Sequence, residues 1–173
     1  MRKPLHTIIH LSGVAACFLL IAMVVMMFSS IVLRQFGILL AGTEDVATFS
    51  MVGLAFLGMP SVYIAGMHIR VETVYARLSD PTQRRMDIFC TGLGVLICLI
   101  LVYLSAVLAW DSYRFGDTSF GLLPVPLWIP QLPIPIGLSL MSLALLDDMI
   151  TLIRGGLASF QIAPENEEAS HAE

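Results

Sequence analysis

Charged residues divide the chain into four long apolar stretches. Lys, Arg, Asp and Glu are absent from 4–33, 46–67 and 88–109, and the fourth stretch, about 132–153, contains only Asp147 and Asp148. A helix rises about 1.5 Å per residue, so roughly 20 apolar residues cross a hydrocarbon core about 30 Å thick. The short segments of alternating polarity that mark a membrane β-barrel do not occur. The pattern predicts an all-α integral membrane protein with four transmembrane helices, spanning about 11–33, 46–67, 88–109 and 131–153.

The first apolar stretch also has some features of a secretory signal. It follows Arg2 and Lys3, and 14–16 (Val-Ala-Ala) loosely resembles a cleavage site. A signal sequence, however, has an apolar region of about 7–15 residues, whereas this stretch continues from 11 to 33. We therefore expect the first span to be retained.

Positive charges are distributed unevenly between the two sides of a four-span chain. The N-terminus, the middle loop and the C-terminus share one side and carry seven of the nine Lys and Arg residues, while Arg34 and Arg114 lie on the other. Because cytoplasmic loops carry an excess of Lys and Arg, we expect both termini to be cytoplasmic. The tips of the two hairpins would then face the periplasm.

The loop between the second and third spans has a helical pattern of its own. Val71, Val74, Tyr75 and Leu78 are spaced at i, i+3, i+4 and i+7, which places them on one apolar helix face. The pattern predicts a short amphipathic helix over 69–78 that lies along the membrane interface. At the other end of the chain, 156–173 is polar and acidic, and we expect a disordered cytoplasmic tail.

Gly and Pro residues indicate where helices end, bend and approach one another. The first helix can continue to Ala41 and end at Gly42, with Thr43 as N-cap of the second. Gly53 and Gly58 lack side chains and so favour close helix packing in lipid. Later, the Pro-rich apolar segment 124–130 is incompatible with regular helix and predicts a rigid cap that holds Trp128 at the membrane interface.

The composition excludes several functions. Only 13% of residues are charged, and there is no basic cluster suited to nucleic acid. The three cysteines lie inside predicted spans without the spacing of a metal or redox site, so we interpret them as packing residues. Asp147 and Asp148 are the only acids within a span. Counted from Trp128, they fall near the cytoplasmic surface, where we expect a solvated or Arg-paired role rather than ion coupling.

A haem- or quinone-binding membrane anchor is the main alternative class. His6 and His10 are four residues apart near the start of the first span, but the later spans contain no His, and His68 is the only plausible partner. A stand-alone small carrier or channel is the third class. Such a carrier needs a substrate site near the membrane midplane, and the sequence shows none. We expect no cofactor, no metal and no enzymatic activity.

Several short motifs, taken in order, resemble one family. They are 34–36 (Arg-Gln-Phe), Glu44, 56–58 (Phe-Leu-Gly), 68–72 (His-Ile-Arg-Val-Glu), Trp110, Ser119, 124–130 and 135–137 (Pro-Ile-Gly). Within the four-span frame, over about 8–155, the chain is similar to the small permease (Q-type) subunit of tripartite ATP-independent periplasmic (TRAP) transporters. Asp45 departs from the second Glu found in many relatives, but the negative charge is kept.

The resemblance implies a non-catalytic role in the bacterial inner membrane. In that family a periplasmic substrate-binding protein captures an organic acid, and a large M-type permease carries it inward with an ion gradient, usually sodium. The small subunit would pack on the large permease as a scaffold and help to dock the binding protein. Membrane lipids would surround it, and the sequence does not indicate the substrate. The charged and rigid groups near the periplasmic face are the docking candidates: Glu44, Asp45, Asp111, Arg114, Asp117 and Trp128.

Overall fold

In the computed structural model the chain is a row of long helices. The structure describes residues 2–38, 42–66, 80–121 and 124–155. Its helices are α1 (Arg2–Gln35), α2 (Thr43–Ile64), α4 (Asp80–Phe115), the single turn α5 (Trp128–Gln131) and α6 (Pro133–Ile153). Four segments are long and apolar enough to cross a membrane: Leu5–Gln35, Thr43–Ile64, Thr82–Phe115 and Trp128–Ile153. The expected all-α architecture with four membrane-spanning helices is confirmed.

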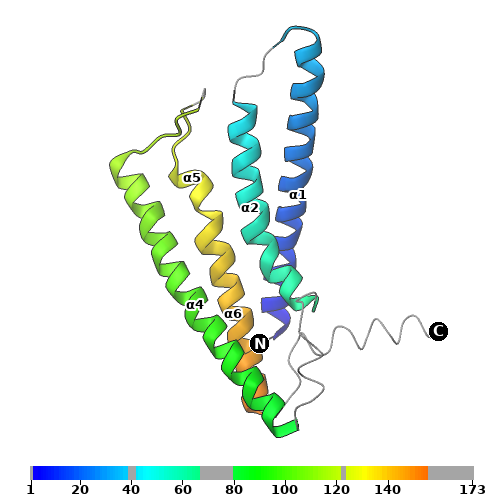
Figure 1. Cartoon of the computed structure of the whole chain (residues 1–173), viewed down its shortest axis with the longest axis vertical. Helices are drawn as coiled ribbons and strands as arrows, with labels where there is room; N and C mark the ends of the chain where they lie inside the picture. The colour runs from blue at the N-terminus through cyan, green and yellow to red at the C-terminus, as the bar shows by residue number, and fades with distance from the viewer. Residues whose placement is uncertain (1, 39–41, 67–79, 122–123, 156–173) are drawn as a thin grey trace, which may run out of the picture.

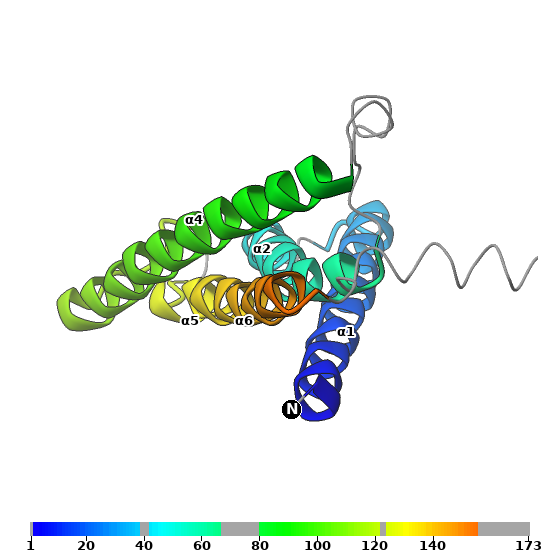
Figure 2. The same ribbon diagram turned by 90° about the horizontal axis from the view of Figure 1, so that it is seen from below.

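The helices pack in the order α1, α2, α6, α4 rather than in chain order. α1 packs mainly on α2, α2 also packs on α6, and α6 packs on α4 (Figure 1). Seen from below, α1 and α4 are visible along much of their length, so both run obliquely at the two edges of the row (Figure 2). α6 is the most buried of the four spans and α1 the least.

The core lies where α2, α4 and α6 meet near the start of α1. It contains Ile9, Tyr63, Val95, Met141, Ala144, Leu145 and Leu152. Each helix contributes through one stripe, so most large apolar side chains of α1 and α4 stay on the outside. Most of the apolar surface of α1 and α4 is therefore not buried within this chain.

Two helix ends differ by a few residues from the sequence-based expectation. α1 ends at Gln35, because Gly37 takes a left-handed conformation (φ 76°) and the amide of Ile38 donates to the carbonyl of Leu33 at 3.0 Å. α2 begins at Thr43, so Gly42 is the N-cap residue and Thr43 is not. The Thr43 hydroxyl instead lies 3.2 Å from that of Ser30 on α1.

The connection from α4 to α6 folds back on itself. Thr118 and Pro126 form an isolated antiparallel bridge, the amide of Ser119 donates to the carbonyl of Val125 at 2.8 Å, and that of Leu127 donates to Asp117 at 3.0 Å. Proline then occupies the first turn of α6, where its missing N–H leaves no helical hydrogen bond unmade. The interfacial helix predicted for 69–78, with Val71, Val74, Tyr75 and Leu78, and the tail 156–173 lie outside the described residues.

Candidate functional site

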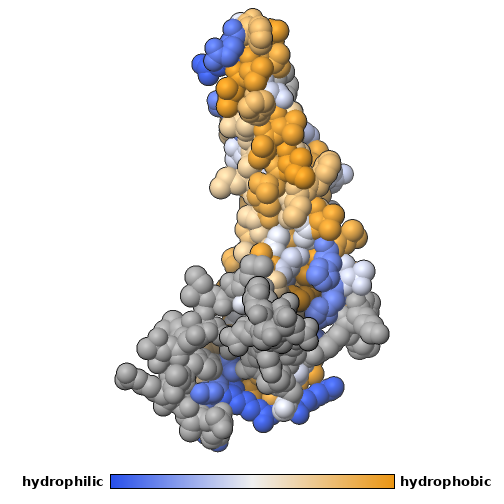
Figure 3. Space-filling model, turned by 90° about the vertical axis from the view of Figure 1, so that its right-hand side faces the viewer, coloured by the Kyte–Doolittle hydropathy of each residue, from blue (hydrophilic) through white to orange (hydrophobic). Residues whose placement is uncertain are grey.

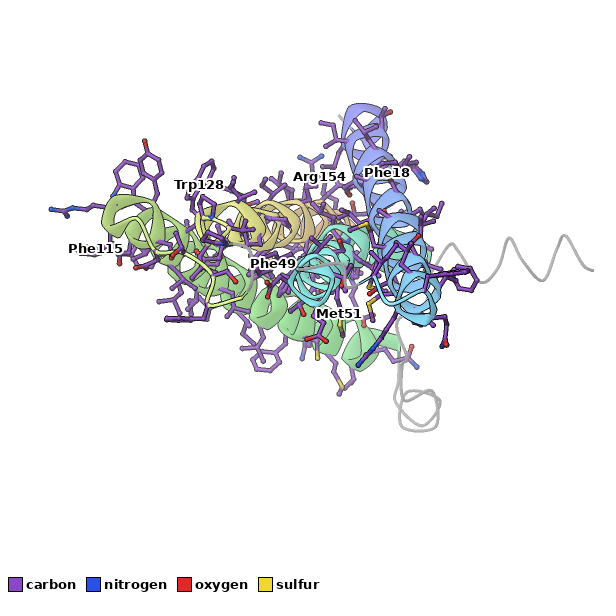
Figure 4. The ribbon with its side chains drawn as sticks, turned by 90° about the horizontal axis from the view of Figure 1, so that it is seen from above. Phe18, Phe49, Met51, Phe115, Trp128 and Arg154 are labelled. Carbon is purple, nitrogen blue, oxygen red and sulfur yellow. The ribbon has the colours of Figure 1, made fainter. Side chains whose placement is uncertain are left out.

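The docking candidates lie at one end of the molecule. The end of α1, the start of α2 and the connection from α4 to α5 lie together at the top of Figure 1; we call this the tip end. Among the candidates, Glu44, Asp111, Arg114 and Asp117 are exposed, and Asp45 and Trp128 are partly buried. In Figure 4, Phe115 at the end of α4 and Trp128 at the start of α5 are seen on the same side of the molecule, away from Phe18 on α1.

One contact joins the two hairpins at the tip end. The carboxylate of Asp45, in the first turn of α2, occupies the space that a side chain at Gly121 would need. Gly121 belongs to the α4–α5 connection, and its amide donates to Oγ of Ser119 at 3.2 Å. The connection therefore rests on the start of α2, and only a residue without a side chain fits at this point without displacing Asp45.

Arg34 is exposed at the same end. Its position before the hairpin tip suggests a partner in Glu44 or Asp45, but among the described residues it forms no ion pair with either. The Ser30–Thr43 hydroxyl contact is the side-chain link that the structure shows between α1 and the start of α2 at this end. An exposed ion pair would in any case stabilise the fold by only about 0–1 kcal/mol.

Three aromatic side chains form a cluster between α4 and α5. The rings of Trp110 and Tyr113 have centroids 6.0 Å apart, and Tyr113 meets Trp128 edge-on at 5.7 Å. Such arrangements suit the ring quadrupole. Beside this cluster is an open, apolar groove of about 360 Å³ between the end of α4 and the start of α6.

Glycines allow close packing within the chain. A methyl group at Gly53 would lie 2.7 Å from Cδ1 of Leu19, and one at Gly58 would lie 3.5 Å from Cβ of Ala16, so both face α1. At Gly137 on α6, a methyl group would collide with the backbone carbonyl of Phe56. Gly53 and Gly58 thus allow α2 to pack closely on α1, and the side chains that contact them belong to this chain.

The other end of the molecule contains a buried polar contact. Asp148 on α6 has no exposed surface, and its Oδ2 accepts a hydrogen bond of 2.9 Å from the hydroxyl of Tyr63 on α2. The expectation of a solvated Asp148 is therefore wrong, because its side chain is fully buried. Counting residues placed it near the end of the span, but not on the face that packs against α2. Asp147, by contrast, is only partly buried.

Nearby, Arg84 on α4 binds the end of α6. Its Nε and Nη2 donate to the carbonyl of Leu152 at 3.1 and 2.8 Å, and Nη2 also reaches that of Ile153 at 3.2 Å. The last carbonyls of a helix lack partners within it. The guanidinium supplies donors for them and places a positive charge at the negative end of the helix dipole. In the sequence, Arg84 contributed only to the count of positive charges on the side of the two termini.

Many large apolar side chains lie on the outer surface. On the side where α1 lies, the described surface is mainly hydrophobic in the upper half of the view, and hydrophilic residues lie at its top and in its lower part (Figure 3). Phe18, Ile21 and Phe28 on α1, and Phe89 and Leu104 on α4, are more than half exposed. Within the described ranges, no group of three or more His, Cys, Asp or Glu residues is placed to hold a metal ion.

These features define a multi-pass membrane protein whose apolar flanks face lipid or another membrane protein. The profile of the family "Tripartite ATP-independent periplasmic transporters, DctQ component" matches residues 23–155. The chain belongs to this family of small TRAP permease subunits, and the resemblance found in the sequence is confirmed. It is thus a transporter subunit of the bacterial inner membrane and not an enzyme.

Comparison with curated proteins gives the same family and two more distant matches. Over 120 residues the chain is 28% identical to the C4-dicarboxylate TRAP transporter small permease protein DctQ of Rhodobacter capsulatus, which covers 69% of this chain and 52% of that protein. It is also 24% identical to the Na(+)/H(+) antiporter NhaA 2 of Psychromonas ingrahamii, over 88% of this chain and 35% of that protein. For NhaA 1 of Shewanella denitrificans the values are 22%, 86% and 36%. The chain thus spans between about a third and about half of the length of these relatives.

Proposed function

We propose that this chain is the accessory membrane subunit of a three-part uptake system for an organic acid. It packs on a large permease at the depth of the lipid and contributes to the surface on which a periplasmic substrate-binding protein docks. The observation that carries the proposal is the match to the DctQ component over residues 23–155. The large permease, and not this chain, would carry the substrate and use the ion gradient, usually of sodium.

The exposed apolar flanks support the scaffold role. Phe18 and Phe28 on α1 are 70% and 67% exposed, and Phe89 on α4 is 70% exposed. A helix that packed fully within its own chain would bury such side chains. Exposing these apolar surfaces to lipid carries no hydrophobic free-energy penalty. They can also make van der Waals contacts with another membrane protein.

The tip end supports the docking role. It carries charged side chains of both signs, and the contact between Asp45 and Gly121 holds the two hairpins together there. Transient protein–protein surfaces are typically polar at their rims, and exposed charges mainly change association rates. With both termini in the cytoplasm, as the positive charges indicate, this surface faces the periplasm.

Uptake by the reconstituted three-part system, with and without this chain, tests the accessory role. We expect uptake to depend on the chain, and full uptake without it would refute the proposal. Charge reversal at Arg114 or Asp117 tests the docking surface. Both variants should slow receptor-dependent uptake, more strongly at low salt, where exposed charges are less screened. Unchanged uptake in both would remove the docking surface and leave the scaffold role standing.

The matches to antiporters suggest a stand-alone carrier as the alternative function. The same liposomes distinguish it, because a carrier would transport with this chain alone. A haem anchor would show visible absorption in the purified chain. We expect neither transport by the chain alone nor such absorption.

A further inference from the structure

The proposed function leaves the groove at the tip end unused. It holds about 360 Å³ and opens to one side. α4 supplies one wall, and the segment from α5 to the start of α6 supplies the other. Its lining is Ala106, Ala109, Trp110, Tyr113, Trp128, Leu132 and Pro135. None of these side chains carries a charge, so the groove suits an apolar occupant.

The two alanines create the depth of the groove. Ala109 is 7% exposed and forms part of the floor, while Ala106 is exposed one turn earlier on α4. Larger residues surround them, and the adjacent Val107 and Leu108 are outside the lining. A large side chain at Ala106 would therefore enter the groove, whereas the same side chain at Val107 would not.

The residues that line the groove indicate that it lies at the boundary between hydrocarbon and headgroups. Its α4 wall begins in the uncharged stretch 88–109 and continues past Asp111 to Tyr113. Trp110, Tyr113 and Trp128 line it, and Trp and Tyr prefer the membrane interface. An open groove at this depth is filled by whatever the bilayer supplies unless another protein covers it.

A positively charged residue lies one position beyond the groove lining in the sequence. Arg114 directly follows Tyr113 in the last turn of α4, is exposed, and has its guanidinium 5.9 Å from the centre of the Phe115 ring. Within the described part of the chain it forms no ion pair. An arginine here can form charge-assisted hydrogen bonds with a phosphate.

We propose that the groove is a specific binding site for one phospholipid. An acyl chain lies between α4 and α6 against Ala106 and Ala109, and the headgroup phosphate is bound by Arg114. The apolar lining and the arginine one residue beyond it on α4 together match the two ends of a phospholipid. A side chain of a partner protein would match the apolar lining but would leave the role of the cation unexplained.

Native mass spectrometry of the full chain, purified in mild detergent, tests this site. The wild type should keep a phospholipid, Ala106→Phe should lose it, and Val107→Phe should keep it. Arg114→Gln should lower the occupancy, because the phosphate loses its cation. Equal retention in wild type and Ala106→Phe would overturn the proposal, and unchanged occupancy in Arg114→Gln would overturn the headgroup assignment.

A second measurement locates the lipid. The chain has two tryptophans, and both line the groove. Trp110→Phe leaves Trp128 as the only tryptophan. In nanodiscs, phospholipids with acyl chains brominated at mid-depth should quench the fluorescence of Trp128. Adding Ala106→Phe should relieve the quenching, and adding Val107→Phe should not. Equal quenching in both double variants would contradict the site. Displacement of the phospholipid when the large permease is added would show a protein occupant and overturn the proposal.

Discussion

The hydroxyl of Tyr63 donates a hydrogen bond to Oδ2 of Asp148 across 2.9 Å, and this contact joins α2 to α6 in the interior. Tyr63 is 5% exposed and Asp148 is fully buried. A carboxyl group removed from water needs hydrogen-bond partners, since leaving it without them costs more than the bond gains. The contact is therefore one of those that hold α2 against α6 at this end.

Removing the Tyr63 hydroxyl should destabilise the fold. We expect Tyr63→Phe to lower the free energy of unfolding by about 1–2 kcal/mol, between the values for membrane-buried hydrogen bonds and for bonds to charged groups. Denaturation by SDS, followed by circular dichroism, would measure it. Tyr103→Phe on the exposed face of α4 is the control and should leave stability unchanged, because Tyr103 is 69% exposed.

Substitution at Asp148 separates hydrogen bonding from charge. Asp148→Asn keeps a carbonyl oxygen that can accept from Tyr63, so it should lose less stability than Asp148→Leu. Asp148→Leu leaves the Tyr63 hydroxyl without this acceptor and should be less stable by about 1–3 kcal/mol. If Asp148→Leu were as stable as the wild type in SDS denaturation, the bond would not contribute to folding.

Arg84 and Arg85 form a matched pair for testing the contact with α6. Both side chains are exposed, but Arg84 binds the carbonyls of Leu152 and Ile153, whereas Arg85 makes no such bond in the described structure. We expect Arg84→Ala to lower the unfolding free energy by about 1–2 kcal/mol and Arg85→Ala to change it by less than about 0.5 kcal/mol. Amide hydrogen exchange in the last turn of α6 should rise only in Arg84→Ala. Equal exchange in the two variants would argue against the cap.

Gly137 should not tolerate even a methyl group. A Cβ there would meet the backbone carbonyl of Phe56, which cannot rotate away as a side chain can. We expect Gly137→Ala to cost about 1–3 kcal/mol through overpacking of α2 against α6. At Gly94 the nearest atom is Cδ1 of Leu145 at an ordinary 3.6 Å, so Gly94→Ala should be neutral or slightly stabilising. Thermal unfolding in detergent would compare the two variants, and similar midpoints would contradict the predicted close approach.

Cysteine labelling tests the orientation of the chain. After removal of Cys17, Cys90 and Cys98, single cysteines at Glu44 and Thr118 should react with an impermeant maleimide in intact cells. One at Arg154 should react only after the membrane is permeabilised. Arg154 lies on the side that carries most of the positive charges, and such a side is normally cytoplasmic. All three positions are exposed in the structure, so access within the protein is not limiting. Labelling of Arg154→Cys in intact cells would contradict the predicted orientation.

The sequence predicted the helices well and their mutual contacts poorly. Uncharged stretches and prolines reflect local physical chemistry, so the number of helices and the proline-led start of α6 could be inferred. The Tyr63–Asp148 bond joins residues 85 positions apart and depends on which face of α6 meets α2. The same holds for Gly137, whose neighbour Phe56 is on another helix. A glycine or an acid in a span indicates that a special contact exists, but not with which residue.

The length of α1 has a consequence for the surrounding bilayer. Its uncharged part, from Pro4 to Leu33, would measure roughly 45 Å as a straight helix, against about 30 Å of hydrocarbon. The oblique course of this helix reconciles the two values, since tilting is how a long span accommodates hydrophobic mismatch. α2 and α6 are shorter, at 22 and 21 residues. A thinner membrane would therefore be met by a greater inclination of the outer helices, while the central pair, joined through Tyr63 and Asp148, keeps its packing.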